Sequence, residues 1–358
     1  MKIKDIELAN ISRFRGELMG AAMLFVILFH VSLPRSDAFF GLRRMGNIGV
    51  DIFLFLSGIG LWFSWMKGRL EERGERREER EGKEEESGFW RKLGDFYKRR
   101  FIRIYPAWLI MASLFYVPDY LGPRKFSQTF VDLLGDVLIN WDFWLYDELT
   151  FWYVPSIMML YLFAPFYMVL IDRHAVYKWL PVVMVMWCIL VQWVTPIHQA
   201  VGHLEIFWSR VPIFFIGINM GEMVRQRERI DGTGIWMILL MFVMALSASM
   251  FLEQERHGQF PLFIERMLYI PLTVTSVLLL NRVFRRTPSW FNSVMKWVGA
   301  LSLEAYLIHA HFVLVYIEPY RLGYWLTFLL TVAITLPLSW LLFVVCKKLS
   351  SNLNRLIR

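Results

Sequence analysis

The sequence is poor in cysteine and lacks the short motifs of the common soluble enzymes. Its two cysteines, Cys188 and Cys346, both lie inside apolar runs, which argues against a structural disulfide and against a cysteine–histidine zinc site. It contains no G-x-S-x-G elbow, Walker A motif, H-E-x-x-H pair or G-x-G-x-x-G loop. Any chemistry must therefore use scattered polar side chains, and no metal site is expected.

Charge is also scarce relative to apolar surface. Only 20% of the 358 residues are charged, whereas 56% are hydrophobic, with 30 Phe and 16 Trp and a mean hydropathy of +0.42. A soluble protein of this size has no interior large enough for so much apolar surface, but a lipid bilayer accepts it. Although the net charge is +8, the basic residues sit at the ends of apolar runs, which indicates membrane orientation and no nucleic-acid partner.

Ten apolar runs approach the length of about 20 residues that spans a 30 Å hydrocarbon core. We therefore predict an all-α, polytopic membrane bundle of about ten transmembrane helices, in a single domain over 1–358. A half-apolar stretch, Phe130–Leu149, carries Asp132, Asp136 and Asp142 and is interpreted as an amphipathic or re-entrant surface segment. The predicted spans are 16–33, 48–66, 102–118, 151–171, 179–195, 207–224, 234–252, 264–281, 297–317 and 324–346.

The distribution of basic residues predicts the orientation of these spans. With the N-terminus in the cytoplasm, 30 of the 39 Lys and Arg lie on the inside and 9 on the outside, as the positive-inside rule requires. Both termini are then cytoplasmic in a multi-pass inner-membrane protein. The first apolar run lacks a small-x-small cleavage site, so we expect a retained helix. The charge-dense insert at 67–92 is expected to form a mobile, partly helical cytoplasmic extension.

His30 ends the first apolar run and is the first ionisable candidate for function. At about 1.5 Å per residue it lies roughly 18 Å beyond the start of its helix, toward the outer face. A neutral imidazole is a suitable general base near pH 7. The alternative is an interfacial histidine that is hydrogen-bonded to neighbouring backbone.

Asp51 stands at the outer start of the second predicted helix. There it could orient or charge-stabilise an imidazolium, or simply cap the helix N-terminus. The glycines Gly58 and Gly60, together with Ser57, would let another helix approach closely.

Arg99, Arg100 and Arg103 lie at the cytoplasmic mouth of the third predicted helix. Guanidinium groups in this position suit a phosphorylated ligand that arrives from the cytosol. The alternative is a plain positive-inside anchor.

The ninth predicted helix carries Glu304, His309 and His311 within an apolar run. Glu304 and His311 are seven residues apart and are expected on one helical face, with His309 pointing elsewhere. These side chains indicate a polar cavity or, alternatively, interhelical hydrogen bonds that lock the bundle.

Taken in this order, these segments resemble the acyltransferase-3 family of integral-membrane acyltransferases. The resemblance covers residues 10–346. Each motif alone is degenerate, and their joint order makes the resemblance specific. The similar segments are MLFVILFH, GVDIFLFLSG, RRFIRIYP, the Trp-containing FWYVPSIMMLYLFAPF and LSLEAYLIH.

The resemblance implies transfer of an acyl group, usually acetyl from cytosolic acetyl-coenzyme A, to a carbohydrate hydroxyl on the far side of the membrane. It implies that His30 is the catalytic histidine and that Arg100 and Arg103 lie near the coenzyme A phosphates. The family often has an arginine eleven residues before the histidine, where this chain has Met19, so a specific role for nearby Arg15 is in doubt.

The resulting site hypothesis has three parts. His30 and Asp51 form the catalytic group. The donor-binding group is Arg99, Arg100, Arg103 and Tyr105. The substrate or cavity-lining group is Arg15, Glu17, Ser57, Trp152, Glu304 and His309.

Two other functions remain open on the sequence. A transporter or translocase of a lipid-linked sugar would also bury His, Glu and Arg in a bundle, although no long internal repeat indicates an inverted-repeat transporter. A structural or signalling membrane protein would leave the arginines and histidines at opposite ends unexplained. The acceptor could be a surface polysaccharide, a lipid-linked glycan or peptidoglycan, and transfer could be direct or pass through an acylated His30.

Overall fold

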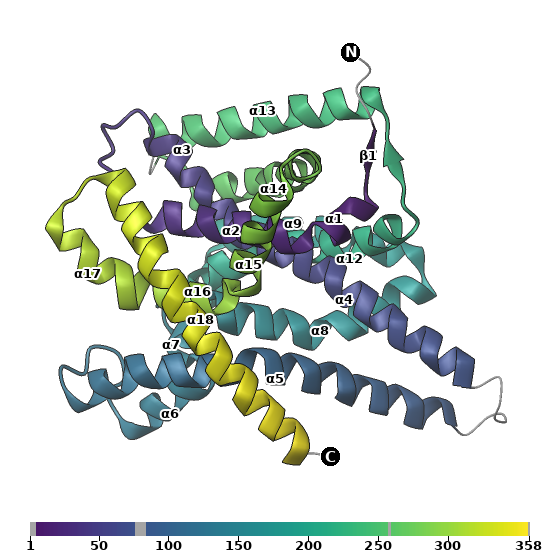
Figure 1. Ribbon diagram of the computed structural model, residues 1–358, viewed down its shortest axis with the longest axis horizontal. Helices are drawn as coiled ribbons and strands as arrows, with labels where there is room; N and C mark the ends of the chain where they lie inside the picture. The colour runs from purple at the N-terminus through teal and green to yellow at the C-terminus, as the bar shows by residue number, and fades with distance from the viewer. Residues whose placement is uncertain (1–4, 76–83, 257–258, 357–358) are drawn as a thin grey trace.

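The computed structural model describes residues 5–75, 84–256 and 259–356. Within these residues the chain is helical almost throughout, which confirms the predicted all-α class (Figure 1). The strands are two short antiparallel segments, β1 (Ile6–Glu7) and β2 (Arg229–Ile230), which tie the N-terminal segment to the turn after α12. The longer helices are α2 (Arg15–His30), α4 (Ile48–Glu75), α5 (Glu84–Leu121), α8 (Tyr153–Arg173), α9 (Leu180–Trp193), α12 (Val211–Arg225), α13 (Gly232–Gln254), α14 (Leu262–Phe284), α15 (Ser289–Ala300) and α18 (Tyr324–Leu356).

Short helical segments connect these longer helices. The chain enters α2 through α1 (Ala9–Arg13). The remaining segments are α3 (Phe40–Arg44), η1 (Met45–Asn47), α6 (Phe130–Ile139), α7 (Trp141–Leu145), η2 (Ala175–Trp179), α10 (Thr195–Val201), η3 (Gly202–Leu204), α11 (Glu205–Trp208), α16 (Ser302–Ile308), η4 (His309–Leu314), α17 (Val315–Ile317) and η5 (Glu318–Tyr320).

Seven helices among the described residues are long and apolar enough to cross a membrane, and nine spans result if each of two bent pairs counts as one. The bends are 45° between α11 and α12 and 61° between α15 and α16. With 16 residues, α2 is shorter than the roughly 17–25 residues of a typical span. The protein is therefore a multi-pass membrane bundle, and the count of about ten spans stays a prediction.

Glycines let the central helices pack in close contact. A Cβ atom on Gly20 of α2 would lie 2.1 Å from the carbonyl oxygen of Met295, and one on Gly299 of α15 would lie 2.0 Å from that of Gly16. The predicted close approach at Gly58 is confirmed, because a Cβ there would lie 2.3 Å from the Phe214 carbonyl of α12. These contacts hold α2, and with it His30, against its neighbours.

The segment that was predicted to be amphipathic forms α6 and α7 beside the outer part of α5. The apolar side chains of Phe130 and Leu138 are exposed, whereas Asp136 is fully buried and accepts a 2.7 Å hydrogen bond from Ser127. Burial raises the pKa of the Asp136 carboxyl, and burial together with the negative charge of Asp136 raises that of Asp142 to about 6. An apolar face turned outward over a polar inner face fits a segment that lies at the membrane surface.

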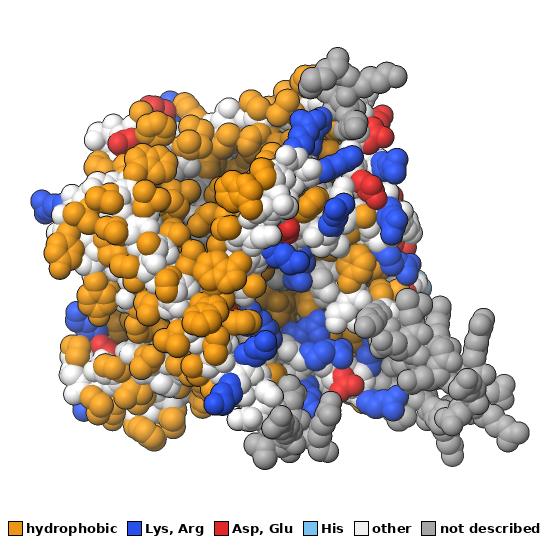
Figure 2. Space-filling model, viewed as in Figure 1, with side chains coloured by type: hydrophobic (Ala, Val, Ile, Leu, Met, Phe, Trp, Pro, Cys, Tyr) orange, Lys and Arg blue, Asp and Glu red, His pale blue; other side chains and the backbone are white. Residues whose placement is uncertain are grey.

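Basic side chains gather at one end of the molecule. Figure 2 shows most Lys and Arg on the side where Figure 1 places both termini and the facing ends of α4 and α5. The described flanks of the charge-dense insert lie at this end. Its flanks are helical, as α4 runs to Glu75 and α5 begins at Glu84, and its middle, 76–83, lies outside the described residues.

Candidate functional site

His30 is the last residue of α2 and lines a cavity of about 290 Å³ in the protein. Its Nδ1 lies 2.8 Å from the carbonyl oxygen of Val26 in the preceding turn. Because a carbonyl can only accept, Nδ1 carries the proton and Nε2 keeps its lone pair. The ring is therefore held in the tautomer that a general base requires.

His309 contacts His30 at the wall of this cavity. The two rings meet nearly at right angles, 85°, with centroids 4.7 Å apart. His309 Nδ1 lies 3.0 Å and 2.8 Å from the carbonyl oxygens of Ala305 and Tyr306. Its Nε2 is buried and has no hydrogen-bond partner among the described residues. Each of the two imidazoles is thus held through Nδ1 by backbone, and both rings line the cavity.

A π-helical segment brings a third histidine into the cavity. The helix that begins at Ser302 widens to the π-helical η4 at His309, and both His309 and His311 line the cavity. The structure differs here from the expectation that His309 points away from His311, because the wider turn of η4 changes the angular spacing of its residues. The complete lining is Val26, Phe29, His30, Arg44, Asn47, Val50, Leu149, Phe151, Trp152, Ile206, Leu262, Arg266, Tyr306, His309, Ala310 and His311.

Asp51 is buried and forms an ion pair with Arg210, the residue that directly precedes α12. Asp51 Oδ2 lies 3.8 Å from Arg210 Nε, and both side chains are at most 3% exposed. The Arg210 guanidinium also donates to Asn47 Oδ1 at 3.1 Å and stands 4.8 Å from the centre of the Trp152 ring. Asp51 therefore pairs with a buried cation, Arg210, that contacts two residues of the cavity lining, Asn47 and Trp152.

The charged groups that act on His30 are Arg43 and Glu318. Glu318, the first residue of η5, accepts a 2.9 Å hydrogen bond from the backbone N–H of Ser32. Arg44 and Arg266, which line the cavity, each have acidic partners. Arg44 Nε lies 3.4 Å from Glu253 and 3.6 Å from Glu265, and Arg266 pairs with Glu205. The cavity thus combines compensated charges, aromatic rings and imidazoles.

Arg100 lies in the N-terminal half of α5 and does not line the His30 cavity. Its guanidinium lies 4.1 Å from the centre of the Phe96 ring and interacts electrostatically with Arg15, Arg99 and Tyr161. Arg15 itself reaches across to α4, where a Cβ on Gly60 would lie 2.9 Å from its guanidinium carbon. The structure therefore gathers Arg15 with Arg99 and Arg100 on the basic side of the bundle.

Arg103 uses part of its guanidinium in an ion pair. Its Nη1 donates to Glu304 Oε1 at 2.8 Å, and Glu304 is fully buried at the bend between α15 and α16. The Arg103 side chain is 48% exposed, so donors remain that face outward. Tyr105 donates to the carbonyl of Leu138 in α6 at 3.2 Å, which places its hydroxyl away from the Arg15 side of α5.

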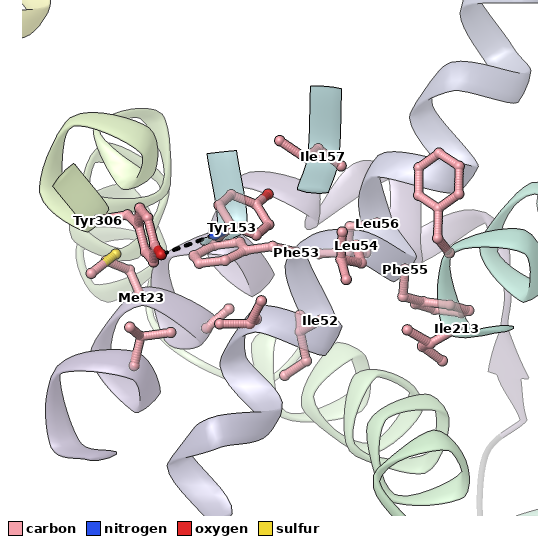
Figure 3. Packing of buried hydrophobic residues seen from close by; sticks show 14 of the residues in the cluster. Met23, Ile52, Phe53, Leu54, Phe55, Leu56, Tyr153, Ile157, Ile213 and Tyr306 are labelled. Atoms are coloured by element: carbon pink, nitrogen blue, oxygen red, sulfur yellow. Dashed lines mark hydrogen bonds between the residues drawn. The ribbon is translucent and has the colours of Figure 1, made fainter. Parts of the chain in front are cut away.

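Two tyrosines connect the histidine cavity to the interior of the bundle. Figure 3 shows Tyr306 of α16 beside Tyr153 of α8, with Met23 of α2 and Phe53 of α4 next to them. The Tyr306 hydroxyl oxygen lies 3.2 Å from the backbone nitrogen of Tyr153 and accepts its hydrogen. Tyr153 interacts electrostatically with Arg15 and with Tyr161, the aromatic neighbour of Arg100. Polar groups therefore continue from the histidines toward the arginines.

The structure places some of the site residues predicted from the sequence at the cavity and others elsewhere in the bundle. His30, Trp152 and His309 line the cavity, and Asp51 lies beneath it. Glu304 does not line it but pairs with Arg103. Ser57 and Glu17 are buried in α4 and α2, and one Glu17 oxygen has no hydrogen-bond partner among the described residues.

Sequence reasoning missed Arg210, Tyr306 and the cavity role of His311. Arg210 lies inside the predicted span 207–224 and is 2% exposed. A charge at the edge of a span was the signal that could have found it. Tyr306 lies inside the segment LSLEAYLIH, but no pattern in that segment distinguishes a cavity-lining tyrosine from a packed one.

Comparison with protein families matches residues 20–344 to the family described as an acyltransferase domain. The match covers nearly the whole chain and includes the helices that carry His30, Asp51, Arg100 and His309. Comparisons with curated proteins and with solved structures give no significant match.

Proposed function

The chain belongs to the acyltransferase-3 family, and from that premise we propose that it moves acetyl from cytosolic acetyl-coenzyme A to a hydroxyl of a cell-surface carbohydrate. The observation that carries the proposal is the hydrogen bonding of the His30 ring. Its Nδ1 donates to Val26, so Nε2 is a lone-pair acceptor at the wall of a 290 Å³ cavity. That is the geometry of a general base for an alcohol.

In the proposed reaction the acceptor hydroxyl loses its proton to His30 Nε2. The oxygen forms an ester bond with the thioester carbonyl carbon, and the carbon–sulfur bond breaks. The coenzyme A thiolate leaves and takes the proton back from the imidazolium. His309 Nε2 supplies a second acceptor, which orients the hydroxyl or its neighbour on the sugar.

The cavity lining supports a carbohydrate as the acceptor. Trp152 and Phe151 offer apolar ring faces, while Asn47, Tyr306 and the two arginines at its wall offer polar groups. This mixture of aromatic faces and a few directed polar groups is typical of small-molecule sites. In this proposal Asp51 acts as a positioning residue, because it pairs with Arg210, which in turn contacts Asn47 and Trp152.

Arg99, Arg100 and Arg103 are the proposed anchors for the donor phosphates, with Arg15 beside them. Planar guanidinium groups bind phosphate through paired charge-assisted hydrogen bonds. Arg100 keeps its guanidinium available, since its protein contacts are a ring face and one long 3.4 Å bond to the Phe96 carbonyl. The donor's pantetheine arm would then extend past Tyr161 and Tyr153 toward His30.

This assignment places the basic end of the bundle in the cytoplasm and His30 toward the outer face of an inner membrane. The gathering of Lys and Arg at the end that holds both termini supports it (Figure 2). An acyl group would then pass through the bundle, while coenzyme A stays on the side where it is made.

The test uses the purified chain in sealed vesicles with acetyl-coenzyme A labelled in the acetyl group. The proposal predicts release of free coenzyme A thiol in step with ester-linked label on an added glycan. Glycan movement without thiol release would instead identify a translocase. Rapid quenching should find no acylated protein on the reaction path, and a kinetically competent acyl group on His30 would replace direct transfer with a covalent relay.

A further inference from the structure

A second hollow lies on the opposite side of the last turn of α2 from the histidine cavity. Its volume is about 390 Å³, and its walls come from α2, α3, α13, α14 and the start of α18. The walls are aliphatic and aromatic apart from Arg43, Ser276, Tyr324 and the indole of Trp325. We call this hollow the α13–α14 groove. Its volume is within the range of about 300–1,000 Å³ that holds small ligands.

The α13–α14 groove opens on the surface that faces lipid. Phe39 and Leu42 of the α3 segment and Trp325 of α18 border it and are 46–60% exposed. Figure 2 shows hydrophobic side chains over this part of the molecule. Helix α13 is largely exposed along its length, with only 22% of its most apolar stretch buried. A hydrocarbon chain could therefore enter sideways from the bilayer.

Arg43 carries the only charge among the residues described around the groove. Its Nη1 donates to the carbonyls of Phe29 and Val31, both at 2.9 Å, and its Nε is buried without a hydrogen-bond partner. The described residues place no carboxylate within ion-pair distance of Arg43, whereas its neighbour Arg44 has two. A buried guanidinium donor without a partner, at the end of an apolar groove, suits a phosphate headgroup.

Arg43 also connects the groove with the reaction centre. The two carbonyls that it contacts belong to the residues on either side of His30, and Arg43 interacts electrostatically with His30 itself. The last turn of α2 is a common wall, because Phe25 and Leu28 face the groove while Val26, Phe29 and His30 face the cavity. A phosphate held at Arg43 would bring the group attached to it to the end of α2, beside His30.

We propose that the α13–α14 groove holds the hydrocarbon chain of a lipid-linked sugar, with the lipid phosphate at Arg43 and the sugar passing over the end of α2 into the His30 cavity. The acceptor is thus delivered from the bilayer and acylated while still attached to its lipid. This assignment of the acceptor class rests on the proposed acyltransferase function. A water-soluble polysaccharide would need neither the groove nor its arginine.

The test uses a polyprenyl phosphate with a photoreactive diazirine in its chain, added to the purified full-length chain in nanodiscs without any acyl donor. After irradiation, mass spectrometry should map the label to groove residues of α13 and α14. Unlabelled polyprenyl phosphate should displace the label, whereas phosphatidylglycerol at the same concentration should displace it less than twofold. Equal displacement by phosphatidylglycerol, or label spread evenly over the lipid-facing helices, would overturn the proposal.

Three variants sharpen this measurement. Leu246→Trp fills the groove from α13 and should reduce labelling at least tenfold. Met244→Trp places the same side chain on the same helix, where Met244 is 63% exposed and outside the groove, and should change labelling less than twofold. Arg43→Gln removes the charge and should also reduce labelling about tenfold. Equal labelling of the two tryptophan variants would contradict the proposal that the lipid binds in the groove.

The outcomes separate this inference from the proposed function. Labelling is measured without donor or turnover, so it does not depend on acyl transfer. If the chain is labelled specifically but transfers no acetyl group, the proposed function fails, and the bound lipid is then not an acyl acceptor. Acetyl transfer by a chain that shows no specific labelling would overturn the groove alone and leave the proposed function in place.

Discussion

His30 and His309 pack edge to face in the lining of one cavity, with ring centroids 4.7 Å apart. Each donates Nδ1–H to a carbonyl of its own helix, His30 to Val26 and His309 to Ala305 and Tyr306. Both rings are therefore fixed by backbone, and both Nε2 atoms are left as acceptors. Two fixed acceptors in one cavity suit the binding and deprotonation of a hydroxyl group.

His309→Gln should lower kcat/KM for the acceptor about tenfold to a hundredfold and leave the KM for the donor unchanged. The variant loses one hydrogen bond to the acceptor but keeps the base, His30. The measurement is steady-state acetyl transfer at varied acceptor concentration. His198→Gln is the control, because His198 also contacts a backbone carbonyl, that of Val191, but lies outside the cavity. An equal effect of the two substitutions would contradict the role of His309.

Arg100→Ala should raise the KM for acetyl-coenzyme A about tenfold or more and reduce the salt dependence of donor binding. The loss corresponds to one or two charge-assisted hydrogen bonds to phosphate. Initial rates at varied donor and salt concentrations measure both effects. Arg286→Ala removes an exposed arginine from the turn after α14 and should change the donor KM less than twofold. A donor KM that stays at the wild-type value in Arg100→Ala would exclude Arg100 from the donor site.

Asp51→Asn should lower the free energy of unfolding by about 3–5 kcal/mol, because it leaves Arg210 buried without its counter-charge. The double variant Asp51→Leu with Arg210→Met removes both charges and should recover most of that stability. It should not recover acetyl transfer, since the cation that contacts Asn47 and Trp152 is gone. Denaturation in detergent and activity assays on the same preparations separate the two effects. Full activity in the double variant would show that the pair is structural only.

Gly20→Ala should destabilise the protein by about 1–3 kcal/mol, which is typical of overpacking. The new methyl would lie 2.1 Å from the Met295 carbonyl oxygen and would push α2 away from α15. Because α2 carries His30, activity should fall together with stability. Gly94→Ala is the matched control, because a Cβ there meets nothing within 4 Å and helix propensity alone should add about 0.5–1 kcal/mol. Thermal unfolding curves that coincide for the two variants would contradict the close packing.

Composition and periodicity predicted the helices well, because a span is a local property of about 20 residues. The predicted run 264–281 lies within the helix Leu262–Phe284, and 48–66 lies within the span Phe40–Met66. The 61° bend between Ala300 and Ser302 was not predicted. Both sides of that bend are apolar, so hydropathy alone reads them as one continuous run.

Single residues of the site could be predicted from the sequence, but the contacts between them could not. The family resemblance identified His30 and Arg100, but their partners come from distant parts of the chain. Asp51 meets Arg210, and Arg103 meets Glu304 across 201 residues of sequence. Such pairs depend on how helices pack, and a single sequence carries no signal for them. The π-helical η4 likewise changes which histidines share a face, which a fixed period of 3.6 residues cannot anticipate.

The most direct measurement of the central claim is kcat/KM for acetyl transfer in His30→Ala, compared with the wild type and with His174→Ala. His174 is an exposed histidine outside the cavity, directly after α8, and its substitution should change the rate less than twofold. Loss of a general base predicts that His30→Ala is slower by about 10²–10⁴-fold, with an unchanged KM for the donor. A His30→Ala protein that is folded and keeps more than about a tenth of the wild-type rate would contradict the role of His30.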